Sequence, residues 1–325
     1  MKVFIVGGTG FLGYHATLEF LKRGHQVDTM SLPDIPLGDW FPKDKVGVSY
    51  GNVFEMSDAE LVETFKGYDA MVYAVGPDDR ITPDAPAYEF FYERLVKACG
   101  RVVKGAKNAG VKRCVVCNSY FAYFDRERSE LELAEHHPYI KCRIEQAEHC
   151  IEVGNSTMDV MILELPYIFG TMPEREPLWK ETFVDRIKKM KGFIWFFKGG
   201  TVMMAVERVA ESIVGAIEKG THGKRYPCGD ECVTWDEWLS WIMEAMDVER
   251  KIIHIPTFIG TLYGALLRRK DKKEGKEAGL NHKKLFKDIQ TRKLFYDPTP
   301  TCEELGVSRG GLKESVIKTI KRCLE

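Results

Sequence analysis

The sequence predicts an α/β protein, in which a doubly wound parallel sheet is followed by a smaller mixed lobe. Short apolar runs alternate with segments of helical spacing along the first half of the chain. Four glycines also fall within residues 7–13, directly after the first apolar run. With 325 residues, of which 44% are hydrophobic and 29% charged, the chain has the composition of a globular protein large enough for this fold.

The first unit of the chain has the order strand, turn, helix, strand. "KVFIV" is a β-branched and aromatic run bounded by glycine, which predicts a buried strand. Leu12, Ala16 and Phe20 recur every four residues, so an amphipathic helix is expected there. "HQVDTMS" then predicts a second strand, which completes a βαβ unit.

The glycines lie in the turn of this unit. Gly8, Gly10 and Gly13 fit the pattern G-x-G-x-x-G, and Gly7, Gly10 and Gly13 fit the wider G-x-x-G-x-x-G. Such a turn brings bare backbone N–H groups and a helix N-terminus to one place, which favours a pyrophosphate. Between a strand and a helix it therefore predicts dinucleotide binding, with a tight turn that binds nothing as the alternative.

The end of the second strand should distinguish the two dinucleotides. A carboxylate there would bind the ribose 2′-hydroxyl of NAD, whereas an arginine would accept the 2′-phosphate of NADP. The strand ends instead in Ser31 and Leu32, while Asp28 lies inside it and Asp34 lies beyond a proline. The choice between NAD and NADP stays open.

The alternation continues and then stops. "VGVSYGNV", "YDAMVYAVG", "KRCVVCNS" and "DVMILEL" read as further strands separated by helical segments. From about Pro166 the chain becomes polar and rich in proline. We therefore expect a dinucleotide-binding domain over residues 1–165 and a mainly substrate-binding lobe over 166–325, with 203–228 returning to the first domain.

Charge and cysteine content restrict the partners and the compartment. The net charge of −1 gives no electrostatic drive toward nucleic acid. Nine cysteines without a disulfide framework, and a first strand without a signal-peptide pattern, predict a cytoplasmic protein with reduced thiols. Cys114 and Cys117 would face opposite sides of a strand and fill the core, and Cys228 and Cys232 lack a second ligand pair, so no metal site is expected.

A basic run, "RRKDKKEGK" at 268–276, stands out from this balanced charge. We interpret it as a solvated loop. A contact with a membrane surface or a phosphate is the alternative, because the apolar "FIGTLYGALL" just precedes it. That apolar stretch is too short to span a bilayer, so no transmembrane segment is expected.

Taken in order, these segments resemble the extended short-chain dehydrogenases/reductases, the NAD-dependent epimerase/dehydratase group. "GGTGFLG" matches the cofactor turn, "KRCVVCNS" the strand with the catalytic hydroxyl, and "ILELPYIFG" the strand into the substrate lobe. "FYDPTPTCEELGVSRGGLKESVIKTI" resembles the C-terminal segment of the family. The resemblance covers nearly the whole chain and implies a Rossmann-type domain.

The resemblance also implies site residues. Ser119 falls at the catalytic hydroxyl position and Tyr139 at the catalytic phenol, with a helix-surface aromatic as the alternative for Tyr139. The family has lysine four residues after that tyrosine, where this chain has Arg143. The residues expected to bind NAD or NADP are Gly7, Gly10, Phe11, Leu12, Gly13, Ser31, Asn52, Val53, Ala74, Val75, Gly76, Pro166 and Ile168.

Arginine in place of lysine alters the acid/base chemistry expected at Tyr139 but does not abolish it. Residues four apart share a helix face, so Arg143 can meet Tyr139, and a nearby cation lowers the pKa of a phenol. Arginine can also donate to the nicotinamide ribose, but it stays charged and cannot pass a proton onward. Three further positions depart from the family: Leu95 replaces an asparagine, Glu164 an arginine, and Arg208 an aspartate.

Two classes of function follow. The first is an enzyme, expected as a homodimer, that transfers hydride between NAD(P) and a hydroxyl or carbonyl carbon of a nucleotide-sugar. A hydrophobic alcohol or ketone is the competing substrate, favoured by the aromatic "FIWFF", whereas Arg175, Lys180 and Arg186 would suit a diphosphate. The second class is a dinucleotide-binding regulator without turnover. His136 and His137 lie near Tyr139, and we interpret them as surface residues, with a role as proton donors as the alternative.

Overall fold

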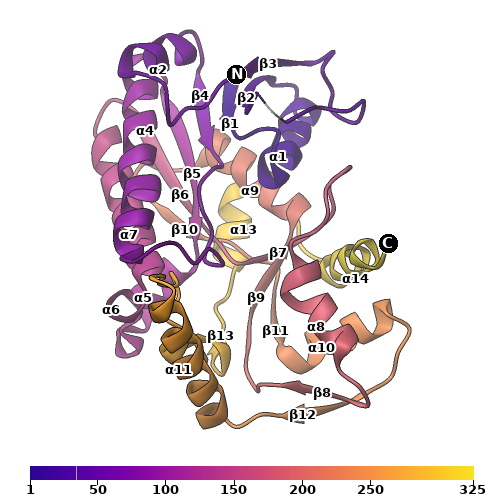
Figure 1. The fold of residues 1–325 in the computed structure, drawn as a ribbon. Helices are drawn as coiled ribbons and strands as arrows, with labels where there is room; N and C mark the ends of the chain where they lie inside the picture. The colour runs from indigo at the N-terminus through magenta and orange to yellow at the C-terminus, as the bar shows by residue number, and fades with distance from the viewer. Residues whose placement is uncertain (34) are drawn as a thin grey trace.

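Seven parallel strands form the central sheet of the computed structural model, which describes residues 1–33 and 35–325 (Figure 1). Asp34, considered above as a ribose ligand, lies outside the described residues. The strand order reverses beside β1, which has β2 on one side and β4 on the other. In sheet order the strands are β10 (Arg225–Pro227), β6 (Asp159–Leu165), β5 (Arg113–Ser119), β4 (Ala70–Tyr73), β1 (Lys2–Val6), β2 (Gln26–Ser31) and β3 (Val46–Tyr50).

Helices cover both faces of this sheet, as the sequence predicts for a doubly wound fold. Each face holds its own apolar core, and Cys114 belongs to one core while Cys117 belongs to the other, which confirms that they face opposite ways. α2 begins at a capping box formed by Ser57 and Glu60. The helices of one face are α1 (Phe11–Lys22) and α9 (Val206–Lys219), and those of the other are α2 (Asp58–Phe65), α4 (Ala98–Asn108) and α7 (Pro138–Gly154).

The second lobe is built around β9 (Gly200–Ala205) and lies beyond the carboxyl ends of the central strands (Figure 1). Trp235 and Trp238, at the start of a capped helix, are buried in its core. The strands of this lobe are β7 (Tyr167–Phe169), β9, β11 (Glu231–Thr234) and β13 (Lys293–Leu294), with β8 (Phe193–Phe196) and β12 (Lys251–His254) as a separate pair. Its helices are α8 (Asp185–Lys189), α10 (Trp235–Ala245), α11 (Thr257–Lys273), α12 (His282–Leu285) and α14 (Leu312–Leu324).

The segment 203–228 is shared between the two lobes. Its first residues complete β9 in the second lobe, whereas α9 packs on α1 and β10 pairs with β6 of the central sheet. α13 (Thr299–Leu305) also packs on α9. The other helical segments are α3 (Ala87–Phe91), η1 (Tyr92–Lys97), α5 (Phe121–Glu127), η2 (Ser129–Leu131), α6 (Leu133–His136), η3 (Lys180–Val184) and η4 (Phe286–Gln290).

Two expectations from the sequence are wrong. Most of the basic run at 268–276 is not a loop, because α11 continues to Lys273 and the run forms its last turns. His137 is not a surface residue: its side chain is fully buried, and its ring accepts a hydrogen bond from the Asn281 N–H at 3.0 Å. His136, which is partly buried, pairs with Asp288 at 2.7 Å. Sequence alone missed these contacts because they join segments about 150 residues apart.

Candidate active site

The glycine turn leads from β1 into α1. Gly7 has φ +89°, and a Cβ on Gly13 would lie 2.1 Å from the Gly7 carbonyl oxygen, so both positions require glycine for the turn itself. A Cβ on Gly10 would meet only that same oxygen, at 3.2 Å, and otherwise points into open space. Within the described part of the chain, no side chain caps the N-terminus of α1. The turn therefore leaves both room and free N–H donors for an anion.

A cavity of about 1120 Å³ begins at this helix end and runs along the carboxyl ends of the central strands. This is larger than the roughly 300–1,000 Å³ that holds a single small ligand. It lies where the strand order reverses, the usual binding place in open α/β sheets. Of the expected site residues, those that line the cavity are Phe11, Leu12, Ala74, Val75, Gly76, Ser119, Tyr139, Arg143, Pro166 and Ile168.

The remaining expected cofactor residues lie around the β2 and β3 ends or in the turn. Ser31 is buried, and its hydroxyl accepts from the Thr9 hydroxyl at 3.1 Å. The Asn52 side chain donates to Glu55 and accepts from the Phe54 N–H, so it shapes a local turn. The Asp28 carboxylate accepts a hydrogen bond from the Tyr68 hydroxyl at 2.6 Å. Neither Ser31 nor Asn52 provides a charge that would select NAD or NADP.

Tyr139 and Arg143 meet inside the cavity. They lie one turn apart near the N-terminus of α7, both are buried, and Arg143 Nε donates to the Tyr139 hydroxyl at 2.9 Å. The guanidinium also donates to Gln146 Oε1 at 2.9 Å, and Asn118 donates to the same oxygen at 3.1 Å. These bonds hold the arginine in one orientation beside the phenol. Tyr139 is therefore a buried cavity residue and not a helix-surface aromatic.

Burial raises the pKa of Tyr139 above its ordinary value, and the Arg143 guanidinium opposes this increase. The net direction is upward because removal of the phenolate from water outweighs the effect of the cation. The cation can be read from the sequence, four residues after the tyrosine, whereas the burial of the phenol arises only from packing.

Ser119 is the last residue of β5 and lines the same cavity. It is buried, and the Asn118 side chain accepts a hydrogen bond from its backbone N–H at 2.6 Å. Its hydroxyl accepts only a long bond, 3.4 Å, from the Phe121 N–H. The hydroxyl can thus donate to a ligand oxygen in the cavity.

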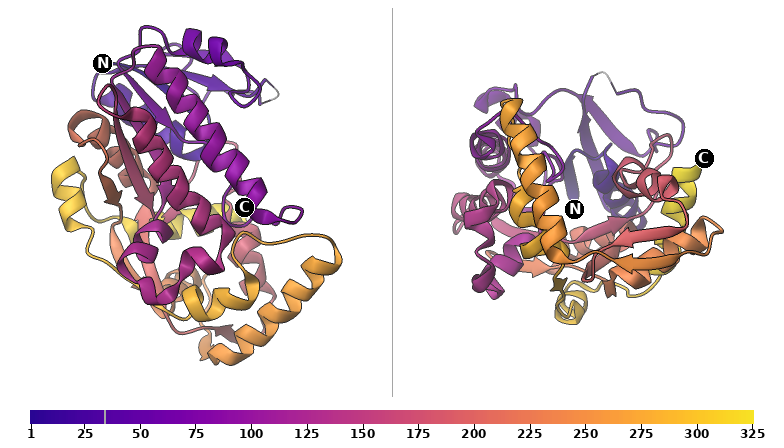
Figure 2. Two further views of the ribbon diagram at one scale, coloured as in Figure 1. Left: turned by 90° about the vertical axis from the view of Figure 1, so that its left-hand side faces the viewer. Right: turned by 60° about the horizontal axis from the view of Figure 1, so that its bottom comes forward.

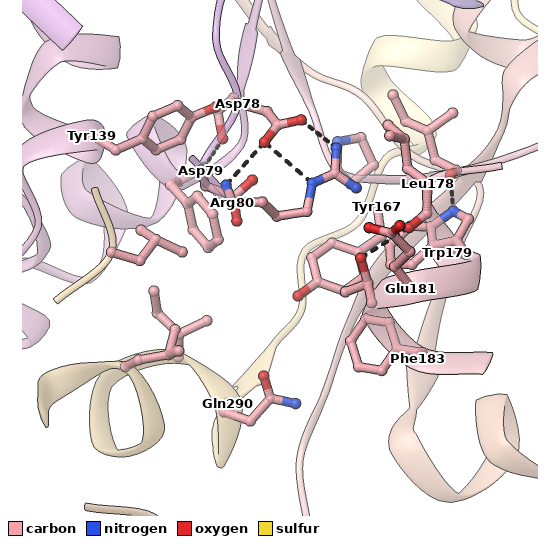
Figure 3. A pocket seen from close by; sticks show the side chains of 18 of the residues that line it. Asp78, Asp79, Arg80, Tyr139, Tyr167, Leu178, Trp179, Glu181, Phe183 and Gln290 are labelled. Carbon is pink, nitrogen blue, oxygen red and sulfur yellow. Dashed lines mark hydrogen bonds and ion pairs between the residues drawn. The ribbon is translucent and has the colours of Figure 1, made fainter. Parts of the chain in front are cut away.

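Charged residues that the sequence analysis missed follow β4. Asp78 and Arg80 form an ion pair in the cavity wall, with Arg80 Nε 3.2 Å from the carboxylate (Figure 3). Asp79 lies beside them, and burial, with Asp78 as a second cause, raises the pKa of its carboxyl group. A polar "PDDR" after a predicted strand end was the available signal, because strand ends open onto the site in this architecture.

The far half of the cavity, in the second lobe, is aromatic. Tyr167, Trp179 and Phe183 lie together on one wall (Figure 3), and Trp179 packs against Tyr167 with ring centroids 5.4 Å apart. The same half is completed by Trp195, Phe196, Phe197, Ile259, Tyr263, Leu285 and Phe286.

Of the three cations expected to bind a diphosphate, two line the cavity and one does not. Arg175 and Arg186 line the cavity and form no ion pair with any described residue. Lys180 does not line the cavity and pairs with Glu176.

The three departures from the family pattern play different structural parts. Leu95 is fully buried beside Gly76, whose added Cβ would lie 3.1 Å from it. Glu164 is fully buried and binds Arg126 at 3.0 Å, away from the cavity lining. Arg208 forms an ion pair with Glu211. Leu95 and Glu164 do not line the cavity themselves, but both adjoin residues that do, Leu95 beside Gly76 and Glu164 directly before Leu165 in β6.

The fold and the glycine turn define a dinucleotide-binding protein with the architecture of the extended short-chain dehydrogenases/reductases. The sequence profile of a family described as NAD(P)H-binding matches residues 7–177, which is more than half of the chain. The chain belongs to this NAD(P)H-binding family.

Individual relatives are distant. The mouse sterol-4-alpha-carboxylate 3-dehydrogenase, decarboxylating, is 23% identical over 283 residues, covering 82% of this chain and 74% of that protein. The crystal structure of a nucleoside-diphosphate-sugar epimerase from Pseudomonas aeruginosa has a TM-score of 0.71 at 15% identity and covers 99% of this chain and 97% of its own. MoeE5 in complex with UDP-glucose and NAD has a TM-score of 0.66 at 17% identity, covering 99% and 98%. The two structures show that the fold is shared.

Proposed function

We propose that the protein is an NAD(P)-dependent oxidoreductase that acts on a hydroxyl or carbonyl carbon of an apolar, ring-containing alcohol or ketone. The observation that carries this proposal is a single cavity with the Tyr139–Arg143 pair and Ser119 at one end and aromatic walls at the other. Such walls favour an apolar molecule, because they provide contact area but few hydrogen bonds. The similarity to a sterol dehydrogenase supports the same substrate class.

The residues suggest how the reaction proceeds. A dinucleotide bound in this cavity would supply the hydride chemistry through its nicotinamide ring. Ser119 orients the substrate oxygen, and Tyr139 takes the hydroxyl proton during oxidation or returns it during reduction. Arg143 stabilises the phenolate, offsetting the burial that disfavours it. Gln146 and Asn118 position the arginine through their bonds to it.

A nucleotide-sugar is the second candidate substrate. Arg175 and Arg186 in the cavity wall, free of ion pairs among the described residues, suit a diphosphate. Solved structures of the same fold include an epimerase of such sugars and a complex with UDP-glucose. The aromatic walls weigh against this candidate, since a diphosphate and a sugar are polar.

The test is an assay of the purified protein with NAD, NADP and their reduced forms. One panel contains hydroxysteroids, sterols and phenolic ketones, and the other contains nucleotide-sugars. The proposal expects nicotinamide absorbance to change with the first panel. A change with the second panel alone would favour the nucleotide-sugar candidate. Tight dinucleotide binding with no oxidation or reduction in either panel would identify a regulator and refute the enzyme.

A further inference from the structure

One side of α11 is apolar and unusually exposed. Phe258, Leu262 and Leu266 follow at intervals of four residues, so they lie along one helix face. Their side chains are 64%, 63% and 60% exposed. The opposite side of the helix is formed by Gly260 and Gly264, which are buried against the rest of the lobe. α11 lies at the outer edge of the second lobe (Figure 2). It packs through its small residues and leaves its large apolar residues exposed.

The exposed face is continuous with the mouth of the cavity. Ile259 and Tyr263, also on α11, line the cavity and are 45% and 55% exposed. Leu178 and Trp195, which belong to other elements of the second lobe, also line the cavity and are 60% and 51% exposed. The opening is thus bordered by large apolar residues that the described part of the chain leaves about half exposed. Isolated exposed apolar residues are ordinary, but a contiguous patch around an opening marks an interaction surface.

Basic residues continue the helix directly after the apolar face. Arg269 follows Leu262, and Lys273 follows Leu266, by about two helical turns. The two cations therefore extend the same side of α11. Arg268, Lys270 and Lys272 are exposed beside them. The acidic residues nearby offset little of this charge: Asp271 turns inward to His282, at 2.9 Å, and Glu274 meets Lys270 only at 3.9 Å. A protein with a net charge of −1 therefore carries a local cationic cluster at the end of its exposed apolar face.

We propose that α11 binds the surface of an anionic lipid bilayer, with Phe258, Leu262 and Leu266 among the acyl chains and Arg269 and Lys273 at the headgroups. The combination of apolar residues and cations on one surface is complementary to such a bilayer. No helix among the described residues is long and apolar enough to cross a membrane, so the contact is peripheral. Because the cavity opens beside this face, an apolar substrate can enter from the bilayer, and this second step rests on the proposed function.

Vesicle sedimentation tests the contact. The full chain should bind vesicles of phosphatidylcholine with about 30% phosphatidylglycerol at least tenfold more tightly than pure phosphatidylcholine, and high salt should weaken the binding. The double variant Leu262→Asp/Leu266→Asp should lose at least tenfold in affinity. The matched control is Leu18→Asp, an exposed leucine on α1, which should bind like the wild type. Equal binding of the double variant and the wild type would overturn the proposal.

Two further measurements keep the test independent of folding and of turnover. Arg269→Gln/Lys273→Gln should lose the preference for anionic vesicles, whereas Lys104→Gln/Lys112→Gln, which removes the same charge elsewhere, should keep it. Brominated lipids should quench the fluorescence of the wild type more than that of Trp195→Phe, because Trp195 borders the opening. The proposal would be overturned if the wild type binds no vesicles and instead forms a dimer that Leu262→Asp dissociates. The apolar face of α11 would then be assigned to a contact with a second copy of the chain. Vesicle binding without turnover in either substrate panel would refute the proposed function alone.

Discussion

At the scale of single residues, the site depends on how one arginine is held. Arg143 reaches the Tyr139 hydroxyl, and its remaining donors bind Gln146 and two backbone carbonyls. A lysine would provide a point charge, whereas the guanidinium is fixed by its planar set of donors. The phenol therefore has a cation in a defined place, in surroundings where burial raises its pKa.

Tyr139→Phe should remove turnover and leave dinucleotide binding unchanged, because it removes only the hydroxyl that we propose as the proton carrier. Arg143→Lys should retain activity, since a cation remains. Arg143→Met should move the alkaline limb assigned to the phenol to higher pH, because loss of a cation raises the pKa of a phenol. Rates measured against pH for the three variants check these outcomes.

Tyr88→Phe is the matched control for this series. Its hydroxyl binds Glu145, and it does not line the cavity, so this variant should react like the wild type. Full activity in Tyr139→Phe would refute the mechanism and leave Ser119, Asp79 or a bound water as the proton carrier.

Asp230 gives a prediction about stability. One carboxylate oxygen accepts from the Ala205 N–H at 2.7 Å, the other is buried without a partner among the described residues, and burial raises the pKa of Asp230 to about 7. The ordinary value is about 4, so between these values the folded state binds more protons than the unfolded state. Stability from this group is therefore greatest at acidic pH and is lost as the pH rises through 7.

Asp230→Asn removes the charge and keeps a hydrogen-bond acceptor. It should stabilise the protein by about 2–3 kcal/mol more at pH 8 than at pH 5. Urea unfolding at the two pH values measures the difference. Asp44→Asn, at an exposed position, is the control. Equal effects of Asp230→Asn at both pH values would contradict the proposed titration.

At the scale of elements, we expect the β1–α1 unit to provide the anion site. Gly10→Val should abolish NAD(P) binding with little loss of stability, because its side chain points into the space left for the pyrophosphate and meets only the Gly7 carbonyl. Calorimetry of binding, together with circular dichroism to confirm folding, tests this. Gly24→Ala is the comparison variant: its φ of +80° strains an alanine, so it should cost stability, but it lies at the far end of α1 and should still bind. If Gly10→Val binds like the wild type, the assignment of the turn is wrong.

Some secondary-structure elements can be predicted from local sequence patterns, and others cannot. β1 and α1 can be predicted from their apolar periodicity and from the glycines between them, because these signals are local. The last turns of α11 were predicted to be a loop because they are highly charged. Charge indicates exposure to solvent, but it does not exclude a helix. Lys and Arg are good helix formers, so a basic run is compatible with a helix.

At the scale of the whole molecule, dinucleotide binding should stabilise the fold. A ligand at a hundred times its dissociation constant adds about 2.7 kcal/mol. Because Ser31 and Leu32 end β2 without a charge, NAD and NADP should both raise the melting temperature, and their dissociation constants should differ by less than about a hundredfold. Thermal shift and calorimetry with each dinucleotide measure this. A larger difference would reveal a selective contact elsewhere.

The sequence by itself determined the parallel sheet, the glycine turn and the spacing that brings Tyr139 and Arg143 together, because each depends on residues close in the chain. Only the tertiary structure decided what surrounds them. The burial that raises the pKa of Tyr139, the ion pair of Asp78 and Arg80 in the cavity wall, and the exposed face of α11 arise where distant segments pack, or fail to pack, against one another. Burial and desolvation are properties of that packing, and no local pattern records them.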